Sequence, residues 1–388
     1  MIKKAAIVSL SFILGVTLSV AAHAKDGVDH AKKIINIAGY DSLTGKFGDY
    51  GITDQRGQQT AVDEINAAGG IASGPLKGYK LKLTFLDDRG DPQEAANVAR
   101  QIAAGDYLVA TGPTISTDAL AATPVFNRAG VPNIITYSNA DTLTRQGFNN
   151  ILRLCYTTRN IAEYVASQVK NRFKKNTVAI ISDNQSYGQQ LMEGFEPAAK
   201  KLGIKIVSHS VTTPDQNDFK AMLMEAKLKN PGVLLIFMAS YNAAGMIVQQ
   251  ARAIGFNVLI YLLDAETQPK FFTLAGNLNN IYIELPPTID ISRPAVQRLK
   301  TEWNKKYPGF PALSGVYGYD AIKLVAAVIE KGGITRASFI DTMHGIKMEG
   351  LANPEYAFAK DGDASTLPPF VTEKCQTYYD TIIKKTQN

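Results

Sequence analysis

The stretch LKLTFLDDRGDPQEAANVARQIAAGDYLVAT (residues 81–111) decides the fold. It begins with an apolar run, continues as a helix-like segment and ends in a second apolar run, YLVAT. Asp91 suits the cap of that helix, Pro92 its first position and Glu94 its third, which makes a box-like helix start. The stretch therefore predicts a strand, a helix and another strand, the unit from which parallel sheets are built.

The same alternation recurs along the chain. Other short apolar runs that adjoin helical patterns are IINIAGY (34–40), VPNIIT (131–136), TVAIISD (177–183), IKIVSHSV (204–211), GVLLIFMA (232–239) and NVLIYLLD (257–264). Strands that alternate with helices predict βαβ units and parallel sheets. Because the series restarts near residue 177, we expect an α/β protein with two doubly wound, Rossmann-like lobes.

Polar segments follow the predicted strands, and ligands of doubly wound sheets bind beyond the carboxyl ends of the strands. These segments are SLTGKFGDYG (42–51), GPTISTDA (112–119), YSNADTLT (137–144), DNQSYGQQ (183–190), ASYNAAG (239–245) and DAETQP (264–269). In GPTISTDA, the hydroxyls of Thr114, Ser116 and Thr117 crowd a strand-to-helix junction. One hydroxyl is enough to cap a helix, so the pattern predicts either a cap or an anion site at a helix N-terminus.

The N-terminus has the pattern of a secretory signal peptide, residues 1–24. Lys3 and Lys4 precede an apolar run at 5–20, and Ala22-His23-Ala24 matches a small-x-small cleavage site. A membrane anchor is the alternative, but the run is followed by no comparable apolar segment. We therefore expect an exported, periplasmic protein. What remains is too long for one ordinary core and suits two lobes.

Charge and motifs argue against several classes of function. The net charge of +6 is mild and the basic residues are scattered, which does not favour a nucleic-acid partner. Among the four histidines, His209 and His344 are isolated, and there is no HExxH, GxSxG or GxGxxG motif. GYDSLTGKF resembles a phosphate loop, but it has five residues between its glycines, and Phe47 follows the lysine. The sequence thus predicts no enzyme, no metal site and no cofactor.

Two cysteines, Cys155 and Cys375, are present. In an exported protein a pair favours one disulfide, and two buried free thiols are the alternative. Without a CxxC motif, a redox or zinc role is weakly supported.

Several runs together are characteristic of one family. They are GGIASGPLKGYKLKLTFLDDRGDPQEAANVARQIA, AGVPNIITYSNADTLT, ILRLCYTTRN, VAIISDNQSYGQQ, QQARAIGF and GYDAIKL. From about Ile34 to its C-terminus the chain resembles the periplasmic solute-binding proteins of the branched-chain amino acid type, which serve ABC transporters. The resemblance implies a type I periplasmic-binding fold, with no enzymatic activity.

The family fold implies two discontinuous lobes joined by three crossings. The crossings would lie near residues 152–156, 284–287 and 368–371. The expected N-terminal lobe comprises residues 33–154 and 285–369, and the expected C-terminal lobe comprises residues 155–284 and 370–388. This arrangement would put Cys155 and Cys375 just past the first and third crossings, on the same side of the hinge. The resemblance therefore predicts a disulfide between them that braces the second lobe.

The resemblance also implies which residues of the first lobe bind the ligand. Ser116 and Thr117 match positions that bind the α-carboxylate of an amino acid, although either could simply cap the helix. Ser138 and Asn139 align with positions that contact the carboxylate and ammonium groups, although an Asx or Ser turn is the alternative. The family usually has one more residue in this segment.

Three tyrosines and one carboxylate complete the expected site. Tyr187 and Tyr241 match tyrosines that close over the ligand from the second lobe, and Tyr50 matches an aromatic residue of the first lobe. Each could instead be a packing residue. Asp264 matches the acid that pairs with the ligand's ammonium, where the family tends to have glutamate. Glu266 is a nearby competitor, and Asp264 could also cap the following helix.

Together these implied roles predict capture of an amino acid, branched-chain or similarly apolar or aromatic, by hinge closure. A monomer would then deliver the ligand to an ABC permease in the membrane. The alternative is the same fold and transport role with an aromatic carboxylate, an amide or a urea-like solute. A subunit that signals ligand occupancy to a membrane receptor would have the same sequence features.

Overall fold

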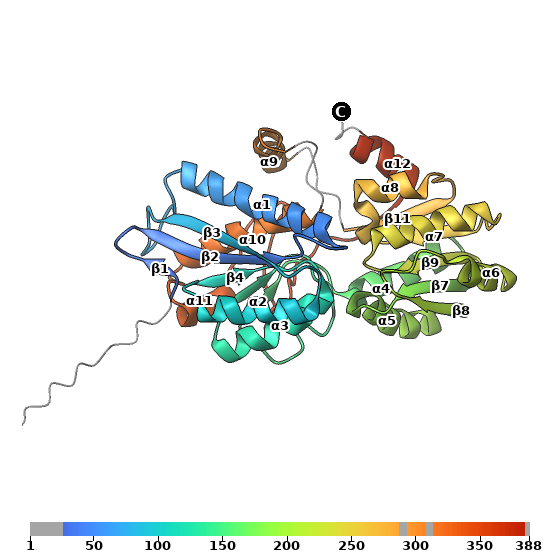
Figure 1. The fold of residues 1–388 in the computed structure, drawn as a ribbon, viewed down its shortest axis with the longest axis horizontal. Helices are drawn as coiled ribbons and strands as arrows, with labels where there is room; N and C mark the ends of the chain where they lie inside the picture. The colour runs from blue at the N-terminus through green and yellow to red at the C-terminus, as the bar shows by residue number, and fades with distance from the viewer. Residues whose placement is uncertain (1–25, 287–292, 308–312, 385–388) are drawn as a thin grey trace, which may run out of the picture.

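The computed structural model describes residues 26–286, 293–307 and 313–384. The predicted signal peptide and Pro287, at the edge of the expected second crossing, lie outside these ranges. Figure 1 shows two α/β lobes beside each other. The prediction of two parallel-sheet lobes is confirmed. None of the helices in the described ranges combines the length and apolarity needed to span a bilayer.

The first lobe contains a six-stranded sheet. Its strands are β1 (Val28–Asp29), β2 (Ile34–Asp41), β3 (Lys80–Asp87), β4 (Val109–Thr111), β5 (Asn133–Ile135) and β6 (Ile151–Arg153). The order runs β1-β2-β4-β5-β6, β3 pairs with β2, and all pairs except β1–β2 are parallel. The carboxyl ends of these parallel strands therefore meet at one edge of the sheet.

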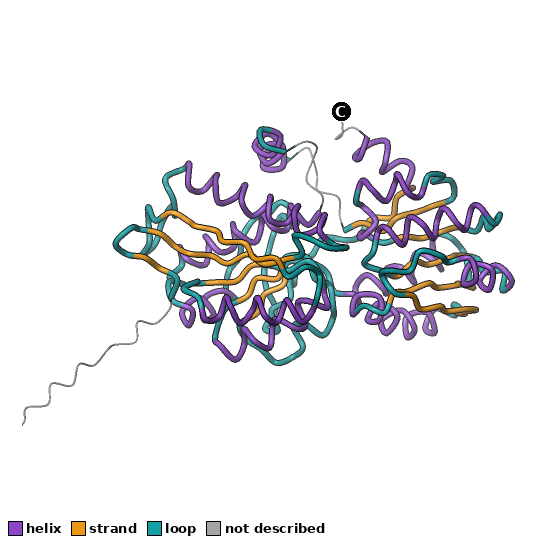
Figure 2. Tube along the Cα trace, in the orientation of Figure 1, coloured by secondary structure: helices purple, strands orange, loops and turns teal. Residues whose placement is uncertain are grey.

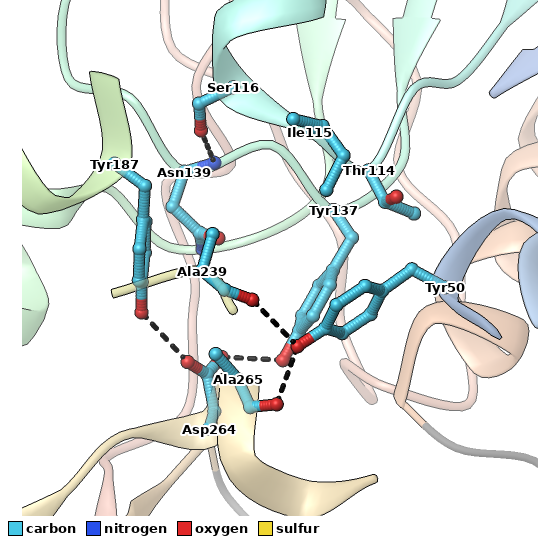
Figure 3. A pocket seen from close by; sticks show the side chains of 10 residues that line it. All are labelled: Tyr50, Thr114, Ile115, Ser116, Tyr137, Asn139, Tyr187, Ala239, Asp264 and Ala265. Atoms are coloured by element: carbon cyan, nitrogen blue, oxygen red, sulfur yellow. Dashed lines mark hydrogen bonds between the residues drawn. The ribbon is translucent and has the colours of Figure 1, made fainter. Parts of the chain in front are cut away.

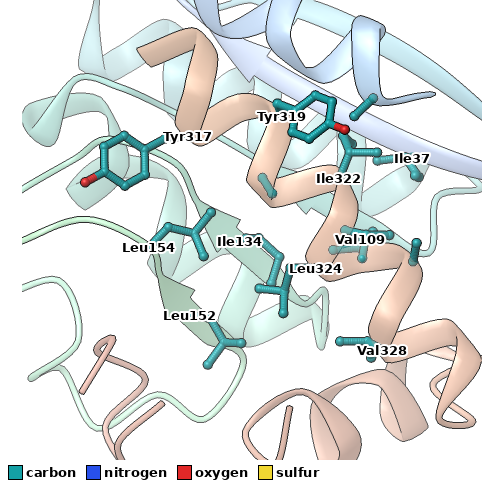
Figure 4. Packing of buried hydrophobic residues seen from close by; sticks show 14 of the residues in the cluster. Ile37, Val109, Ile134, Leu152, Leu154, Tyr317, Tyr319, Ile322, Leu324 and Val328 are labelled. Atoms are coloured by element: carbon teal, nitrogen blue, oxygen red, sulfur yellow. The ribbon is translucent and has the colours of Figure 1, made fainter. Parts of the chain in front are cut away.

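Helices cover both faces of this sheet (Figures 1 and 2). Those that belong to the first lobe are α1 (Gly48–Ala67), α2 (Pro92–Ala104), α3 (Ser116–Ala129), α9 (Pro294–Asn304), α10 (Leu313–Glu330) and α11 (Arg336–Met343). On one face, Ile37, Val109 and Ile134 of three strands pack with Ile322 and Val328 of α10, as Figure 4 shows. On the other face, α2 and α3 pack over a second apolar cluster.

The helix α2 has the Asp91 cap that its sequence predicts, whereas Glu94 does not complete a capping box and accepts from Asn97 at 3.4 Å. The Asp91 side chain accepts hydrogen bonds from the backbone N–H groups of Gln93 (2.8 Å) and Glu94 (3.0 Å), and Pro92 occupies the first turn. These bonds satisfy donors that have no partner inside the helix. The capping role of Asp91 is confirmed.

The second lobe contains the other six-stranded sheet. Its strands are β7 (Thr177–Asp183), β8 (Lys205–Thr212), β9 (Val233–Phe237), β10 (Leu259–Leu262), β11 (Ile281–Leu285) and β12 (Val371–Lys374). The order is β12-β11-β10-β9-β7-β8, and only β12 is antiparallel to its neighbour. The helices around it are α4 (Thr158–Ser167), α5 (Ser186–Leu202), α6 (Lys220–Leu228), α7 (Tyr241–Ala253), α8 (Pro269–Ala275) and α12 (Cys375–Tyr378). Apolar clusters fill both faces of the sheet.

The chain passes between the lobes more than once. After β6, α4 packs on α5 of the second lobe, and after β11, α10 returns to pack against α1 of the first. The last strand, β12, pairs with β11 in the second sheet. The α1–α10 crossing is close because Gly57 lies against the backbone of Gly315, where a Cβ on Gly57 would approach the carbonyl oxygen of Gly315 to 1.8 Å.

The predicted disulfide is wrong in this structure. Cys155 and Cys375 are separate, buried free thiols. Cys155 packs in the apolar core of the first lobe, where its thiol donates to the carbonyl oxygen of Ser138 at 3.4 Å. Cys375 begins α12 and packs in the core of the second lobe. Although both residues follow crossings in sequence, their side chains enter the cores of different lobes.

Candidate functional site

A cavity lies between the lobes at the carboxyl ends of their parallel strands. The lining residues are Tyr50, Thr114, Ile115, Ser116, Tyr137, Asn139, Tyr187, Ala239, Asp264 and Ala265 (Figure 3). The first lobe contributes the start of α1, the β4–α3 turn and the segment after β5. The second contributes the start of α5 and the segments after β9 and β10. This is where doubly wound sheets bind ligands.

Hydrogen-bond donors gather at the start of α3. The helix begins at Ser116, and no side chain caps it. The Ser116 Oγ accepts hydrogen bonds from the backbone N–H groups of Asn139 (3.2 Å) and Ala140 (3.1 Å). Its own hydroxyl proton is thereby left to donate, next to the N–H groups and positive dipole end of the helix. This end of the cavity therefore suits an anion.

The three hydroxyls of GPTISTDA have three different roles. Thr114 donates through its Oγ1 (2.9 Å) and its N–H (3.0 Å) to Asp41. Ser116 lines the cavity. Thr117 faces the second lobe, where its hydroxyl accepts from the N–H of Ser186 (3.1 Å) and donates to the side chain of Gln185 (3.2 Å). The alternative of side-chain capping by Ser116 or Thr117 is therefore wrong.

A glycine fixes the backbone before this helix. Gly112 has φ of +111°, and a Cβ there would approach the carbonyl oxygen of Tyr40 to 2.1 Å. Only glycine combines this conformation with such a close approach. The turn from β4 to α3 is thus held against β2.

Asp264 forms the opposite end of the cavity. Its Oδ2 accepts from the hydroxyl of Tyr137 at 2.5 Å, and its Oδ1 accepts from the hydroxyl of Tyr187 at 3.1 Å. Burial raises the pKa of Asp264, and the hydrogen bonds from the two tyrosines oppose that rise. Glu266 instead accepts from the N–H of Leu263 at 3.0 Å. No side chain caps the following helix, α8, so Asp264 does not have that role, and its carboxylate lines the cavity instead.

Tyr50 extends from the first lobe to the second. Its hydroxyl hydrogen-bonds to the carbonyl oxygens of Ala265 (2.5 Å) and Ala239 (3.2 Å). The ring of Tyr241 packs edge-on against it, with 5.4 Å between the ring centroids, and the Tyr241 hydroxyl donates to Asp49. Tyr241 therefore lies behind Tyr50 and supports it.

Further contacts join the lobes around the cavity. The backbone N–H of Thr142 donates to Gln190 Oε1 (3.0 Å), and Gln190 Nε2 donates to Thr142 Oγ1 (2.9 Å). Arg159 pairs with Asp141 at 3.0 Å. Lys46 of the first lobe forms an ion pair with Asp215 of the second. The cleft is thus closed in this structure.

The predicted site residues fall into two groups. Those that line the cavity are Tyr50, Ser116, Asn139, Tyr187 and Asp264. Those outside its lining are Thr117, Ser138 and Tyr241. Ser138 lies beneath the site and donates to the carbonyl oxygen of Pro113 at 2.8 Å, while Thr117 and Tyr241 contact the opposite lobe.

Sequence reasoning missed the side chains of Ile115 and Tyr137 and the backbone of Ala239 and Ala265, whereas Thr114 belongs to the hydroxyl cluster that it singled out. Tyr137 had a visible signal, because it opens the polar segment YSNADTLT directly after the predicted strand at 131–136. The two alanines contribute carbonyl oxygens, which no residue type reveals. In the described ranges, no group of three or more His, Cys, Asp or Glu side chains is placed to hold a metal ion.

Comparisons with known proteins agree on one family. The family model described as "Periplasmic binding protein" matches residues 34–371. Leu/Ile/Val-binding protein homolog 3 of Brucella melitensis is 28% identical over 331 residues, which cover 84% of this chain and 87% of that protein.

Two crystal structures of similar proteins share the architecture. The leucine binding protein LivK from Thermotoga maritima has a TM-score of 0.79 at 24% identity, over 87% of this chain and 94% of that one. The branched-chain amino acid transporter substrate binding protein LivJ from Streptococcus pneumoniae, in complex with isoleucine, has a TM-score of 0.76 at 25% identity, over 85% of this chain and 93% of that one.

Proposed function

Because this chain belongs to the periplasmic binding protein family, of the branched-chain amino acid type, we propose that it captures an amino acid between its lobes for an ABC importer. The opposite polarity of the two ends of the cavity carries the proposal. Donors at the start of α3 suit a carboxylate, and Asp264 suits an ammonium group. No other charged side chain is among the described residues that line the cavity. An amino acid zwitterion matches this arrangement.

The proposed carboxylate contacts are the Ser116 hydroxyl, the N–H groups of Ser116 and Thr117, and Asn139. Oriented dipoles would hold the anion without a cationic side chain. Ser138 and Thr117 Oγ1 would support this end of the site without lining it. Ser138 fixes Pro113, and the Thr117 hydroxyl binds the start of α5.

The proposed ammonium partner is Asp264. A buried, ionised carboxylate is costly unless a cation or several donors compensate it. Tyr137 and Tyr187 supply two donors, and the ligand would supply the missing positive charge.

The proposed side-chain region lies among Tyr50, Ile115 and Tyr187, with Tyr241 behind Tyr50. Ile115 is wholly apolar, and the two tyrosines present large apolar faces while their hydroxyl protons are donated to Ala265 and Asp264. Such a lining fits an apolar side chain, either branched-chain or aromatic.

Binding is proposed to work by hinge closure between lobes comprising residues 33–154 with 285–369, and 155–284 with 370–388. Only the closed form brings Ser116 of the first lobe and Asp264 of the second to one cavity, so a ligand that contacts both stabilises closure. The closed monomer would dock on the membrane subunits of the importer, and no chemical reaction is involved. Residues 1–24 would direct export to the periplasm as a cleaved signal peptide.

Mass spectrometry of small molecules released by denaturing the purified protein, without prior ligand exchange, tests this proposal. We expect a primary α-amino acid with an apolar side chain. The protein is then refolded without ligand and titrated with that compound in a calorimeter. We expect it to bind one equivalent. Release of an aromatic carboxylate, an amide or a urea-like solute that has no amine would contradict the ammonium assignment of Asp264 and favour the alternative ligand class.

A further inference from the structure

Every hydroxyl group at the Asp264 end of the cavity has already donated its proton. Tyr137 donates to Asp264 Oδ2 and Tyr187 to Asp264 Oδ1, while Tyr50 donates to the backbone carbonyl oxygens of Ala265 and Ala239. A tyrosine hydroxyl has one proton, and its oxygen can still accept. Toward a ligand, these side chains therefore offer acceptors only.

Packing against the first lobe fixes the position of the Tyr137 hydroxyl oxygen. The Tyr137 ring stacks on the ring of Tyr317, with 5.2 Å between centroids and 29° between planes. Tyr317 lies on α10 and is buried in the core of the first lobe. Tyr137 itself is only 6% exposed. Its hydroxyl therefore reaches Asp264 on the opposite lobe from a rigid base, as Figure 3 shows.

Three acceptor groups thus meet at one end of the cavity: the Asp264 carboxylate and the hydroxyl oxygens of Tyr137 and Tyr187. A primary ammonium carries three N–H donors, which matches this set in number and in charge. We propose that Tyr137 is a specificity-determining residue that completes an acceptor-only cup for a primary ammonium group. This proposal rests on the proposed function and adds to it the amine class and the residue that selects it.

The cup would discriminate against close analogues. An N-methylated amino acid has one N–H fewer and a methyl group directed at one of the acceptors. A 2-hydroxy acid brings one donor and two lone pairs to the same three oxygens. Leaving buried acceptors unpaired is costly, and sites built to hydrogen-bond a group reject analogues that lack it.

Closure of the cleft would link the recognition of a primary ammonium group to the capture of the ligand. Tyr187 and Asp264 belong to the second lobe, whereas Tyr137 follows strand β5 of the first. The third acceptor therefore reaches the ligand only when the cleft closes. A primary amine would stabilise the closed form more than its analogues do.

Calorimetric titration tests the proposal with a panel of standard α-amino acids. The tightest-binding one is then compared with its N-methyl and 2-hydroxy analogues on the wild type and on Tyr137→Phe, Tyr187→Phe and Tyr241→Phe. The Tyr241 variant is the matched control, because Tyr241 also makes an interlobe hydrogen bond, to Asp49, but lies outside the cavity lining. Thermal unfolding of each variant checks its folding.

For the wild type, we expect the amino acid to bind at least about a hundredfold more tightly than either analogue. In Tyr137→Phe the ratio between the affinities for the amino acid and for its analogues should fall by about tenfold. The reason is that this variant loses one charge-assisted hydrogen bond to the ammonium group. Tyr187→Phe should lower this affinity ratio similarly. Tyr241→Phe should weaken the binding of all three compounds by the same factor and leave the ratio unchanged. A Tyr137→Phe protein that keeps the wild-type preference would overturn the specificity role alone. A wild type that binds no amino acid of the panel would overturn both this role and the proposed function.

Discussion

Gln190 on the second lobe and Thr142 on the first exchange two hydrogen bonds across the closed cleft, at 3.0 and 2.9 Å. Neither residue lines the ligand cavity. The pair therefore contributes to the closed form without contributing to ligand recognition. Lys46 and Asp215 also join the lobes, but their side chains are 48% and 69% exposed, and ion pairs of this kind add little stability.

Replacing Gln190 with alanine should weaken ligand binding by about thirtyfold, because it removes two hydrogen bonds, each worth about 1 kcal/mol, that form only in the closed state. The change should be the same for every ligand and should appear mainly as faster dissociation. Stopped-flow fluorescence and calorimetry measure both quantities. As a matched control, Lys46→Ala should change affinity less than threefold at physiological salt. Equal effects of the two variants would show that the Thr142–Gln190 pair has no special role in closure.

Replacing Asp264 with alanine should cost about 2–5 kcal/mol of amino acid binding, as expected when one partner of a buried charge pair is removed. The physical reason is that the ligand's ammonium would be buried without a counter-charge. Calorimetry with the compound released from the wild type measures the loss, and Asp215→Ala, which removes an exposed carboxylate, is the control. If Asp264→Ala binds that compound as tightly as the wild type, the ligand carries no cation at this position.

The alternation of strands and helices could be predicted from sequence because it depends on local periodicity. The LKLTFLDD run and the capped α2 helix appear as expected, since Asp91 and Pro92 act on the backbone next to them. The approximate location of the site could also be predicted, because the carboxyl ends of parallel strands follow from the order of the elements. Tyr50, Ser116 and Asp264 line the cavity for this reason.

The remainder of the site depends on tertiary packing, which sequence patterns do not reveal. Tyr137 reaches Asp264 because Tyr317, 180 residues away in sequence, supports its ring. Ser138 is next to Tyr137 but points beneath the site, toward Pro113. The cysteines illustrate the same limit, because their positions after two crossings say nothing of which core each side chain enters. The lobe boundaries and ligand contacts remain predictions.

The two cysteines should behave as buried free thiols. Burial raises the pKa of both thiols above the usual range, which disfavours the reactive thiolate. An aromatic disulfide reagent should therefore label neither cysteine in the folded protein and both after denaturation without reductant. A reducing agent should leave the melting temperature unchanged. If neither thiol reacts in the denatured, unreduced protein, the two cysteines form the disulfide that the family resemblance predicts between Cys155 and Cys375.

Asp118 in the first turn of α3 should make the protein less stable as pH rises. Both of its carboxylate oxygens are buried without a hydrogen-bond partner. Burial raises its pKa to about 9, and the charges of Asp88 and Asp91 add to the rise. An unfolded aspartate ionises near pH 4. Between about pH 4 and 9 the unfolded state therefore releases a proton that the folded state retains, so stability falls as pH rises through this window.

Asp118→Asn removes this titration and should therefore raise the melting temperature relative to the wild type. The gain should be small at pH 4 and should grow steadily toward pH 8, where it corresponds to roughly 5 kcal/mol. Calorimetric unfolding of both proteins across this range measures the difference, with Asp215→Asn as the exposed control. A gain that does not change with pH would show that Asp118 is ionised in the folded protein. In that case a donor or cation near the start of α3 would have to compensate its charge.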